Sequence, residues 1–265
     1  MGAEVAGVDL SAPVDEDLRA ALRRAWLGAG VLVFHDQSLS AVGFERVARL
    51  FGEPAEYPFL RGLAGHPTIT EVVKLEHEVI NFGGVWHADT TYLPAPPIAT
   101  LLIARETPAY GGDTLFACQA AAFAALSDGM QRLLAPLRGV NRSDNPAAAR
   151  TREDRIRDAG REGDARALEA VHPVVRTHPE TGRRALFVNP AHTVRLEGMT
   201  REESAPLLSY LFERQVRPEL TCRVGWRPGT LAIWDNRTLL HNPVNDYHGH
   251  RRVMHRITLE GEIPT

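Results

Sequence analysis

The sequence has little of what marks several large classes of protein. It holds two cysteines, Cys118 and Cys222, which lie far apart and form no CxxC pair, so a disulfide framework or a thiolate zinc site is not expected. No apolar run reaches the roughly 18 residues of a membrane span, and no basic segment followed by an apolar one opens the chain, which argues against a signal peptide. These absences predict a cytoplasmic protein with no membrane partner.

An excess of charge of one sign is also missing. The chain has 30 Lys and Arg against 33 Asp and Glu, which gives a formal net charge of −3 at pH 7. A balance of this kind creates no strong field for polyanions, so no nucleic-acid partner is expected. Neither G-x-G-x-x-G nor a P-loop pattern occurs, which argues against a dinucleotide or P-loop nucleotide site.

What the sequence does hold is many short β-rich runs and few helical ones. Apolar residues at helical spacing predict helices within 11–30, 38–52 and 200–216, the last opening on a Thr200/Glu203 capping box. Short apolar runs between turn residues predict strands at 31–36, 68–75, 97–104, 112–117, 174–179, 184–189, 221–226, 230–236 and 251–261. Because β and α segments do not alternate, the pattern favours a mostly β sandwich or barrel with flanking helices.

A single domain over 1–265 is the simplest organisation for a chain of 265 residues. Its helix-and-strand N-terminal portion would cover 1–68, and a β core would cover about 69–265. A stretch rich in Arg, Asp and Ala at 141–170 has few apolar residues. It is interpreted either as a solvated segment or as a lid over a site.

The segment GGVWHADTTY places two residues of metal-ligand type, His87 and Asp89, two positions apart. On an extended strand such residues project from the same face. A lone His-x-Asp pair also arises by chance in a chain with 11 histidines. The pair therefore predicts a metal site only if the chain supplies a third ligand.

The late segment GTLAIWDNRTLLHNPVNDYHGHRRVMHR supplies the candidate, His241, at the end of an apolar run. Two histidines and one carboxylate on one face of Fe(II) leave three positions open, as oxygenases require. If 251–261 is a strand, Arg252 and Arg256 share one face, and His255 lies on the other. Inward-facing arginines need anions to pair with, so two anionic groups are expected in the cavity.

Several segments in order resemble the taurine dioxygenase / 2,4-D dioxygenase family of Fe(II)- and 2-oxoglutarate-dependent enzymes. They are AEVAGVDLSAPV near the start, FGEP at 51–54, WHADTTYLPAPP at 86–97, YGGDTLFA at 110–117, IWDNRTLLH at 233–241 and RRVMHRITLEGE at 251–262. The resemblance implies a double-stranded β-helix, a cupin-like jelly-roll, with the iron between two sheets.

The resemblance also implies roles for individual residues. His87, Asp89 and His241 would bind Fe(II), and Arg252 and Thr114 would bind the distal carboxylate of 2-oxoglutarate. The implied reaction consumes O2, releases succinate and CO2, and hydroxylates a small organic substrate.

The chain departs from the taurine enzyme at positions expected to bind the substrate. Arg256 would contact an anionic group of the substrate. Tyr57 stands where the taurine enzyme has a substrate-binding histidine, and Asn81 is displaced from an asparagine that would match nearer Gly83. These departures argue against taurine and favour another small or medium organic acid, namely a carboxylate, sulfonate or phosphonate.

Two other functions use the same residues. His87, Asp89 and His241 could hold zinc in a non-redox hydrolase, which would need neither Arg252 nor Thr114. A catalytically silent cupin-like binding protein is the second alternative, although it has no chemical reason to keep all five groups. A homo-oligomer, either dimer or tetramer, is expected in each case.

Overall fold

The computed structural model describes residues 1–146 and 168–265. Its centre is a seven-stranded sheet in which the strands follow the order β1-β2-β13-β5-β15-β3, with β4 also pairing with β15. These strands are β1 (Ala3–Glu4), β2 (Val31–Phe34), β3 (Pro54–Ala55), β4 (Thr70–Lys74), β5 (Ala99–Glu106), β13 (Leu231–Asp235) and β15 (Arg252–Leu259). The N-terminal portion of the chain thus supplies β1, β2 and β3 to the same sheet as the late strands β13 and β15.

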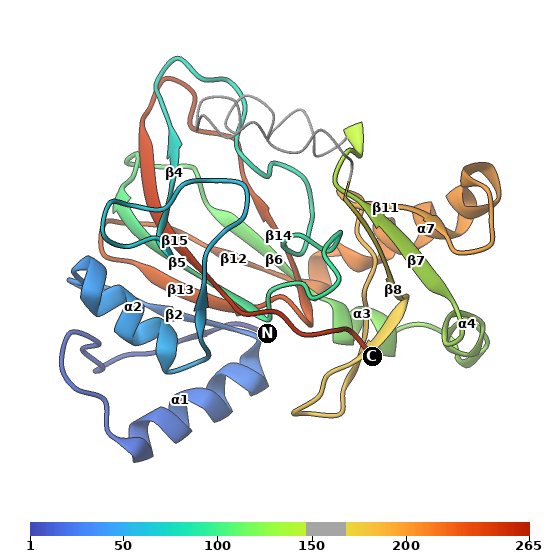
Figure 1. Ribbon diagram of the computed structural model, residues 1–265, viewed down its shortest axis with the longest axis horizontal. Coiled ribbons are helices and arrows are strands. Elements are labelled where there is room, and N and C mark those ends of the chain that lie inside the picture. Colours follow the sequence, from blue (N-terminus) through green and yellow to red (C-terminus); the bar gives the residue numbers. More distant parts are fainter. Residues whose placement is uncertain (147–167) are drawn as a thin grey trace.

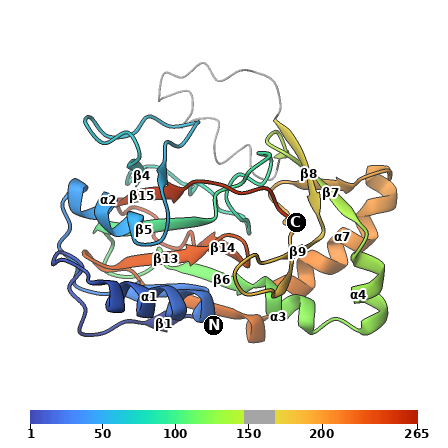
Figure 2. The ribbon, with the colours of Figure 1, turned by 60° about the horizontal axis from the view of Figure 1, so that its bottom comes forward.

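Three smaller sheets accompany the large one (Figures 1 and 2). The first, β12-β6-β14, contains β6 (Thr114–Cys118), β12 (Thr221–Val224) and β14 (Leu239–Pro243). The second, β11-β7-β8, contains β7 (Arg138–Arg142), β8 (Glu169–Pro173) and β11 (Thr193–Leu196). The third is the pair β9 (Val175–Thr177) and β10 (Arg184–Leu186).

The two faces of the large sheet build two different cores. Along β13, Leu231 and Ile233 join the cluster that packs on α1 (Glu16–Ala29) and α2 (Ala41–Arg49). Ala232 and Trp234 join the cluster formed with residues of β6, β12 and β14. Side chains alternate across a strand, so every apolar residue of β13 is buried on one side or the other. The second core fixes the small sheet against the large one, as a jelly-roll requires.

Helices cover both ends of the molecule, with α1 and α2 at one end and α4 and α7 at the other (Figures 1 and 2). The second group consists of α3 (Gln119–Ala124), α4 (Asp128–Leu134) and α7 (Arg201–Gln215), followed by the 3-10 turn η1 (Pro218–Leu220). Among the described residues, no helix has both the length and the apolar character needed to cross a bilayer.

The structure confirms the three predicted helices, and α7 begins with the predicted capping box between Thr200 and Glu203. The short helices α3 and α4 were not predicted. The proposed lid at 141–170 lies mostly outside the described residues, and its described ends belong to β7 and β8.

Candidate active site

Two distant segments meet at the site through their backbones. The amide of His87 donates to the carbonyl of His241 at 3.0 Å, and the amide of His241 donates to the carbonyl of His87 at 2.8 Å. His241 lies in β14, and its ring packs 4.8 Å from the ring of Trp234. This isolated β-bridge brings the two imidazoles to a centroid separation of 4.1 Å.

Asp89 completes a cluster of three potential metal ligands. One ligand atom from each of His87, Asp89 and His241 lies within 4.8 Å of the others. Asp89 Oδ1 lies 3.6 Å from His87 Nε2 and 3.9 Å from His241 Nε2. Two imidazole nitrogens and one carboxylate oxygen are a donor set that suits a ferrous ion, so the residues present fit the metal.

Hydrogen bonds around the cluster set which atoms face inward. His87 Nδ1 donates to the carbonyl of Val85 at 2.6 Å, which leaves the Nε2 lone pair for a metal. Asp89 Oδ2 accepts the Thr100 hydroxyl at 2.5 Å, and Thr100 accepts from Asn236 Nδ2 at 2.9 Å. Asp89 Oδ1 therefore remains directed at the two histidines.

The charge states of the buried ligands match metal binding. Burial, followed by repulsion from His87, lowers the pKa of the His241 imidazole to about 3, so the ring is neutral at pH 7. Burial alone would raise the pKa of the Asp89 carboxyl. The contact with His87 and the charge of Arg256 outweigh burial and hold that pKa well below its usual range. A neutral imidazole and an ionised carboxylate are the forms that coordinate.

The local conformation differs from the extended strand that the sequence predicts. His87 takes part in the single bridge, but Asp89 lies in a turn, and Thr90 has a positive φ of 44°. A non-glycine residue in this region carries backbone strain. His87 and Asp89 therefore do not share a regular extended strand, although their side chains converge on one point.

Arg252 and Thr114 lie between the large sheet and the small one. Arg252 is 5% exposed, and its Nε and Nη2 have no hydrogen-bond partner in the described part of the chain. Its guanidinium carbon is 5.7 Å from the ring of Trp226, and Trp226 Nε1 donates to the Thr114 hydroxyl at 3.0 Å. Thr114 thus accepts this bond and retains its own proton to donate. The unpartnered guanidinium nitrogens fit a carboxylate ligand, as 2-oxoglutarate would supply.

Arg256 is the second buried arginine, and its Nε and Nη2 also have no partner within residues 1–146 and 168–265. The guanidinium carbon lies 4.1 Å from the centroid of the Tyr57 ring and 5.7 Å from that of Phe82. His255 faces the other way, as predicted, and contacts Arg105 and Glu71.

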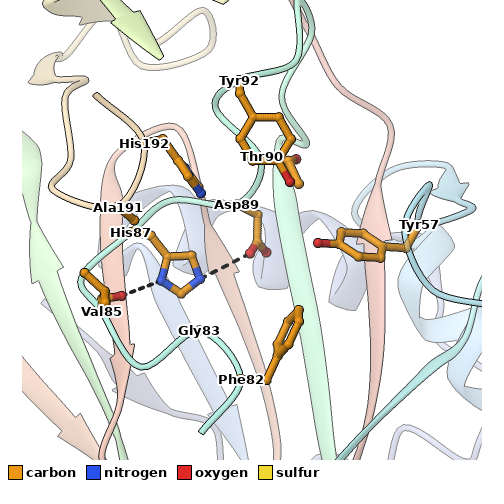
Figure 3. Close-up of a pocket in the computed structure, with 10 residues that line it drawn as sticks. All are labelled: Tyr57, Phe82, Gly83, Val85, His87, Asp89, Thr90, Tyr92, Ala191 and His192. Atoms are coloured by element: carbon orange, nitrogen blue, oxygen red, sulfur yellow. Dashed lines mark hydrogen bonds and ion pairs between the residues drawn. The ribbon is translucent and has the colours of Figure 1, made fainter. Parts of the chain in front are cut away.

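A cavity of about 420 Å³, partly open to solvent, adjoins the metal cluster. Figure 3 shows Tyr57 and Phe82 across the cavity from His87, with Asp89 between them. The lining residues are Tyr57, Phe82, Gly83, Val85, His87, Asp89, Thr90, Tyr92, Ala191 and His192. The wall is therefore largely aromatic, with the metal ligands at one side.

Asn81 occupies a different place from the other candidates. Its Nδ2 donates to the carbonyl of Val244 at 3.0 Å, and its Oδ1 accepts the Tyr247 hydroxyl at 2.8 Å. Among the described residues it is not part of the cavity wall. Its predicted contact with substrate stays a prediction, whereas its visible contacts hold the segment after β14.

Sequence reasoning missed several residues near the site. His192, which the sequence analysis did not single out, lines the cavity and contacts Thr91 through Nδ1 at 3.0 Å. Phe82 and Tyr92 also form its wall. Phe82 lies close to the metal pair in sequence, so its proximity was the available signal. His192 lies far from the metal pair in sequence, and only the tertiary fold brings it to the cavity.

The chain matches a known family over nearly its whole length. The family model described as "Taurine catabolism dioxygenase TauD, TfdA family" matches residues 1–258. The chain belongs to this family. The dioxygenases of this family use Fe(II) and 2-oxoglutarate, and the His87, Asp89 and His241 cluster can bind the metal. The family, the fold class, the enzyme class and the cofactors expected from the sequence are therefore confirmed.

Individual relatives within the TauD, TfdA family are similar along the full chain. An alpha-ketoglutarate-dependent sulfate ester dioxygenase of Pseudomonas putida is 33% identical over 269 residues, which cover 100% of this chain and 88% of that protein. The crystal structure of a taurine dioxygenase from Burkholderia xenovorans has a TM-score of 0.84 and 33% identity, covering 100% of this chain and 88% of that one. The structure of AAD-2 with Mn(II) and N-oxalylglycine has a TM-score of 0.81 and 26% identity, covering 100% of this chain and 95% of that one.

Proposed function

We propose that this dioxygenase hydroxylates an organic acid whose anionic group pairs with Arg256 and whose apolar body lies against the aromatic cavity wall. The observation that carries the proposal is the buried, unpartnered guanidinium of Arg256 beside Tyr57 and Phe82. The charge of Arg256 acts on Asp89, but the two form no direct ion pair, and a buried cation without a paired anion is unfavourable by several kcal/mol. A carboxylate, sulfonate, sulfate or phosphonate on the substrate would remove that penalty.

The assignment of residues to the cofactors follows the same logic. His87, Asp89 and His241 would hold Fe(II), while Arg252 and Thr114 would hold the distal carboxylate of 2-oxoglutarate. When bound, the metal and 2-oxoglutarate would activate O2, the oxidant, with one oxygen atom going to succinate as CO2 is released and the other to the hydroxylated C–H bond. The protein keeps the ligands oriented and places the substrate carbon against the open side of the metal.

The lining of the cavity sets the character of the substrate. Tyr57 can stack on a ring or donate one hydrogen bond, and Phe82 and Tyr92 offer apolar contact. The wall therefore favours aryl or alkyl acids over short, fully polar ones. When the hydroxylated carbon bears a heteroatom leaving group, cleavage of that bond follows.

A coupled succinate assay over matched compounds tests the proposal. Aryl and alkyl carboxylates, sulfonates and sulfate esters are compared with their neutral amides or alcohols. We expect at least one acid to trigger succinate formation and its neutral counterpart to fail. In Arg256→Met, the acid should no longer be preferred over the neutral compound. If neutral counterparts work as well as acids in the unaltered enzyme, the assigned role of Arg256 is wrong.

The alternative function as a zinc hydrolase is tested in the same preparation, since a hydrolase would act without O2 and 2-oxoglutarate. The family assignment favours the dioxygenase over the hydrolase and over a silent binding protein. The homo-oligomer and the cytoplasmic location stay predictions. Light scattering on the purified protein and fractionation of the source cells test them.

A further inference from the structure

Lys74 is a buried cation that the assignments above do not use. It ends β4 and is 4% exposed, and Nζ has no hydrogen-bond partner among the described residues. Nζ lies 4.2 Å from the centroid of the Tyr247 ring, which is its visible electrostatic contact. Burial lowers the pKa of the Lys74 ammonium, although the charge of Glu78 partly opposes this. A lysine is rarely this buried unless it serves a partner.

The strand register directs Lys74 toward the co-substrate side of the site. In the antiparallel pair of β4 and β15, Lys74 stands opposite Arg252. Opposed residues in a sheet project from the same face. Along β4, Thr70 and Lys74 are buried, whereas Glu71 on the other face is exposed. Lys74 therefore shares the inner face with Arg252.

Tyr247 connects the two cations. Its ring centroid is 4.2 Å from Lys74 Nζ and 5.9 Å from the guanidinium carbon of Arg252. Its hydroxyl donates to Asn81, which holds the ring in place. Gly112 packs against two of these residues, because an added Cβ there would lie 3.1 Å from Tyr247 and 3.3 Å from Arg252. The two positive groups thus approach one aromatic ring from neighbouring strands.

Within the described residues, neither Lys74 nor Arg252 forms an ion pair, and the charge of Glu78 acts on Lys74 without a hydrogen bond to Nζ. Asp113, whose charge Arg252 senses, is paired with Arg223. Two buried cations at opposed positions of neighbouring strands are costly until an anion pairs with them.

We propose that Lys74 Nζ is a second cationic contact for the distal carboxylate of 2-oxoglutarate, beside Arg252 and Thr114. This inference rests on the proposed role of Arg252. Lys74 would then increase the preference for 2-oxo acids that carry a distal carboxylate. The competing explanation is purely structural, with Lys74 serving only to hold the Tyr247 ring.

Calorimetric titration of the Mn(II)-loaded protein separates these explanations without a turnover. The ligands are N-oxalylglycine, 2-oxoglutarate and 2-oxopentanoate, which has five carbons but no distal carboxylate. In Lys74→Met we expect the two dicarboxylates to bind about tenfold or more weakly, because a charge-assisted contact is lost. Binding of 2-oxopentanoate should stay unchanged. Glu71→Gln, on the outer face of the same strand, is the matched control. It should change neither the binding of the two dicarboxylates nor the binding of 2-oxopentanoate.

A second variant covers the case in which Lys74→Met fails to fold. In Arg252→Met, Lys74 is the remaining cation, so the preference for 2-oxoglutarate over 2-oxopentanoate should fall but persist. Adding Lys74→Gln to that variant should abolish the preference. An unchanged preference on loss of Lys74, or an equal loss for all three ligands, overturns the inference. Failure of the unaltered protein to bind N-oxalylglycine would instead refute the proposed function itself.

Discussion

At the scale of single residues, the site depends on side chains that do not touch the metal position. Asn236 donates to Thr100, and Thr100 donates to Asp89, so the carboxylate is held by a chain of buried hydrogen bonds. The Val85 carbonyl plays the same part for His87 by fixing the ring orientation. Such outer contacts commonly change metal affinity by one to two orders of magnitude.

Thr100→Val should therefore weaken Mn(II) or Fe(II) binding about 10- to 100-fold while leaving the fold intact. The methyl group replaces the hydroxyl without changing the side-chain shape, and Asp89 Oδ2 loses its donor. Anaerobic metal titration measures the effect. Thr258→Val, at the register partner of Thr100 on β15, controls for loss of a buried threonine hydroxyl. Equal metal affinity in both variants would contradict the assigned role.

The sequence predicted the residue types at the metal cluster but not how they converge. The extended strand expected to carry His87 and Asp89 is only a single bridge at His87, and Asp89 lies in a turn. Lys74 and His192 were missed for a different cause. Their importance comes from burial beside Arg252 and beside the cavity, and neither fact is visible from neighbouring residues.

At the scale of secondary-structure elements, the connection between β13 and β14 is fixed by a buried charged cluster. Asp235 accepts two bonds from Arg237, each 2.8 Å long, and contacts His178 Nε2 at 3.0 Å. Arg237 also donates to Glu180, and its guanidinium lies 5.3 Å from the ring of Trp26 in α1. This cluster ties the hairpin of β9 and β10 to the strand that carries His241.

Asp235→Asn should lower the free energy of unfolding by up to about 3–5 kcal/mol, because Arg237 loses its fully buried carboxylate partner and keeps only the half-buried Glu180 and Glu262. Burial alone would raise the pKa of the Asp235 carboxyl. The hydrogen bonds from His178 and Arg237 outweigh burial, so this pKa is lowered in the folded state. A lowered folded pKa contributes stability above the unfolded pKa of about 4, and this stability is lost as the pH falls below it.

Urea unfolding at pH 7 and below pH 4 measures both effects. The unaltered protein should lose more stability on acidification than Asp235→Asn does. Asp17→Asn, an exposed position in the first turn of α1, is the control and should keep the acid sensitivity of the unaltered protein. Identical acid sensitivity in Asp235→Asn would show that the cluster is not coupled to folding.

Prediction from sequence worked best for elements with strong local signals. The amphipathic helices α1, α2 and α7 were expected, as were the apolar strands β13 and β15. The helices α3 and α4 are short, and their buried residues pack in a cluster with Leu208 and Leu211 of α7. Their helical state depends on that tertiary contact, which local spacing does not encode.

At the scale of the whole molecule, the strands of the N-terminal portion are part of the large sheet, with β1 and β3 at the ends of its strand order and β2 next to β13. β2 pairs with β13, and β3 pairs with β15. Trp26 of α1 lies in the same core as Ile257 of β15. The division at residue 68 is therefore a division of sequence pattern, and we expect the chain to behave as one domain.

Thermal unfolding should accordingly show one cooperative transition. The calorimetric and van't Hoff enthalpies should agree, and far-UV dichroism and tryptophan fluorescence should give the same midpoint. A separate early transition confined to residues 1–68, detected by limited proteolysis, would contradict the single domain. Mn(II) with N-oxalylglycine should raise the midpoint, because both bind the native state alone.

The backbone bridge between His87 and His241 has a consequence for biosynthesis. A nascent chain in which residue 241 has not yet left the ribosome lacks one of the three proposed iron ligands and the strand that positions it. A ferrous site of this composition would therefore form only after that residue has emerged. Products truncated before it would lack the complete ligand set.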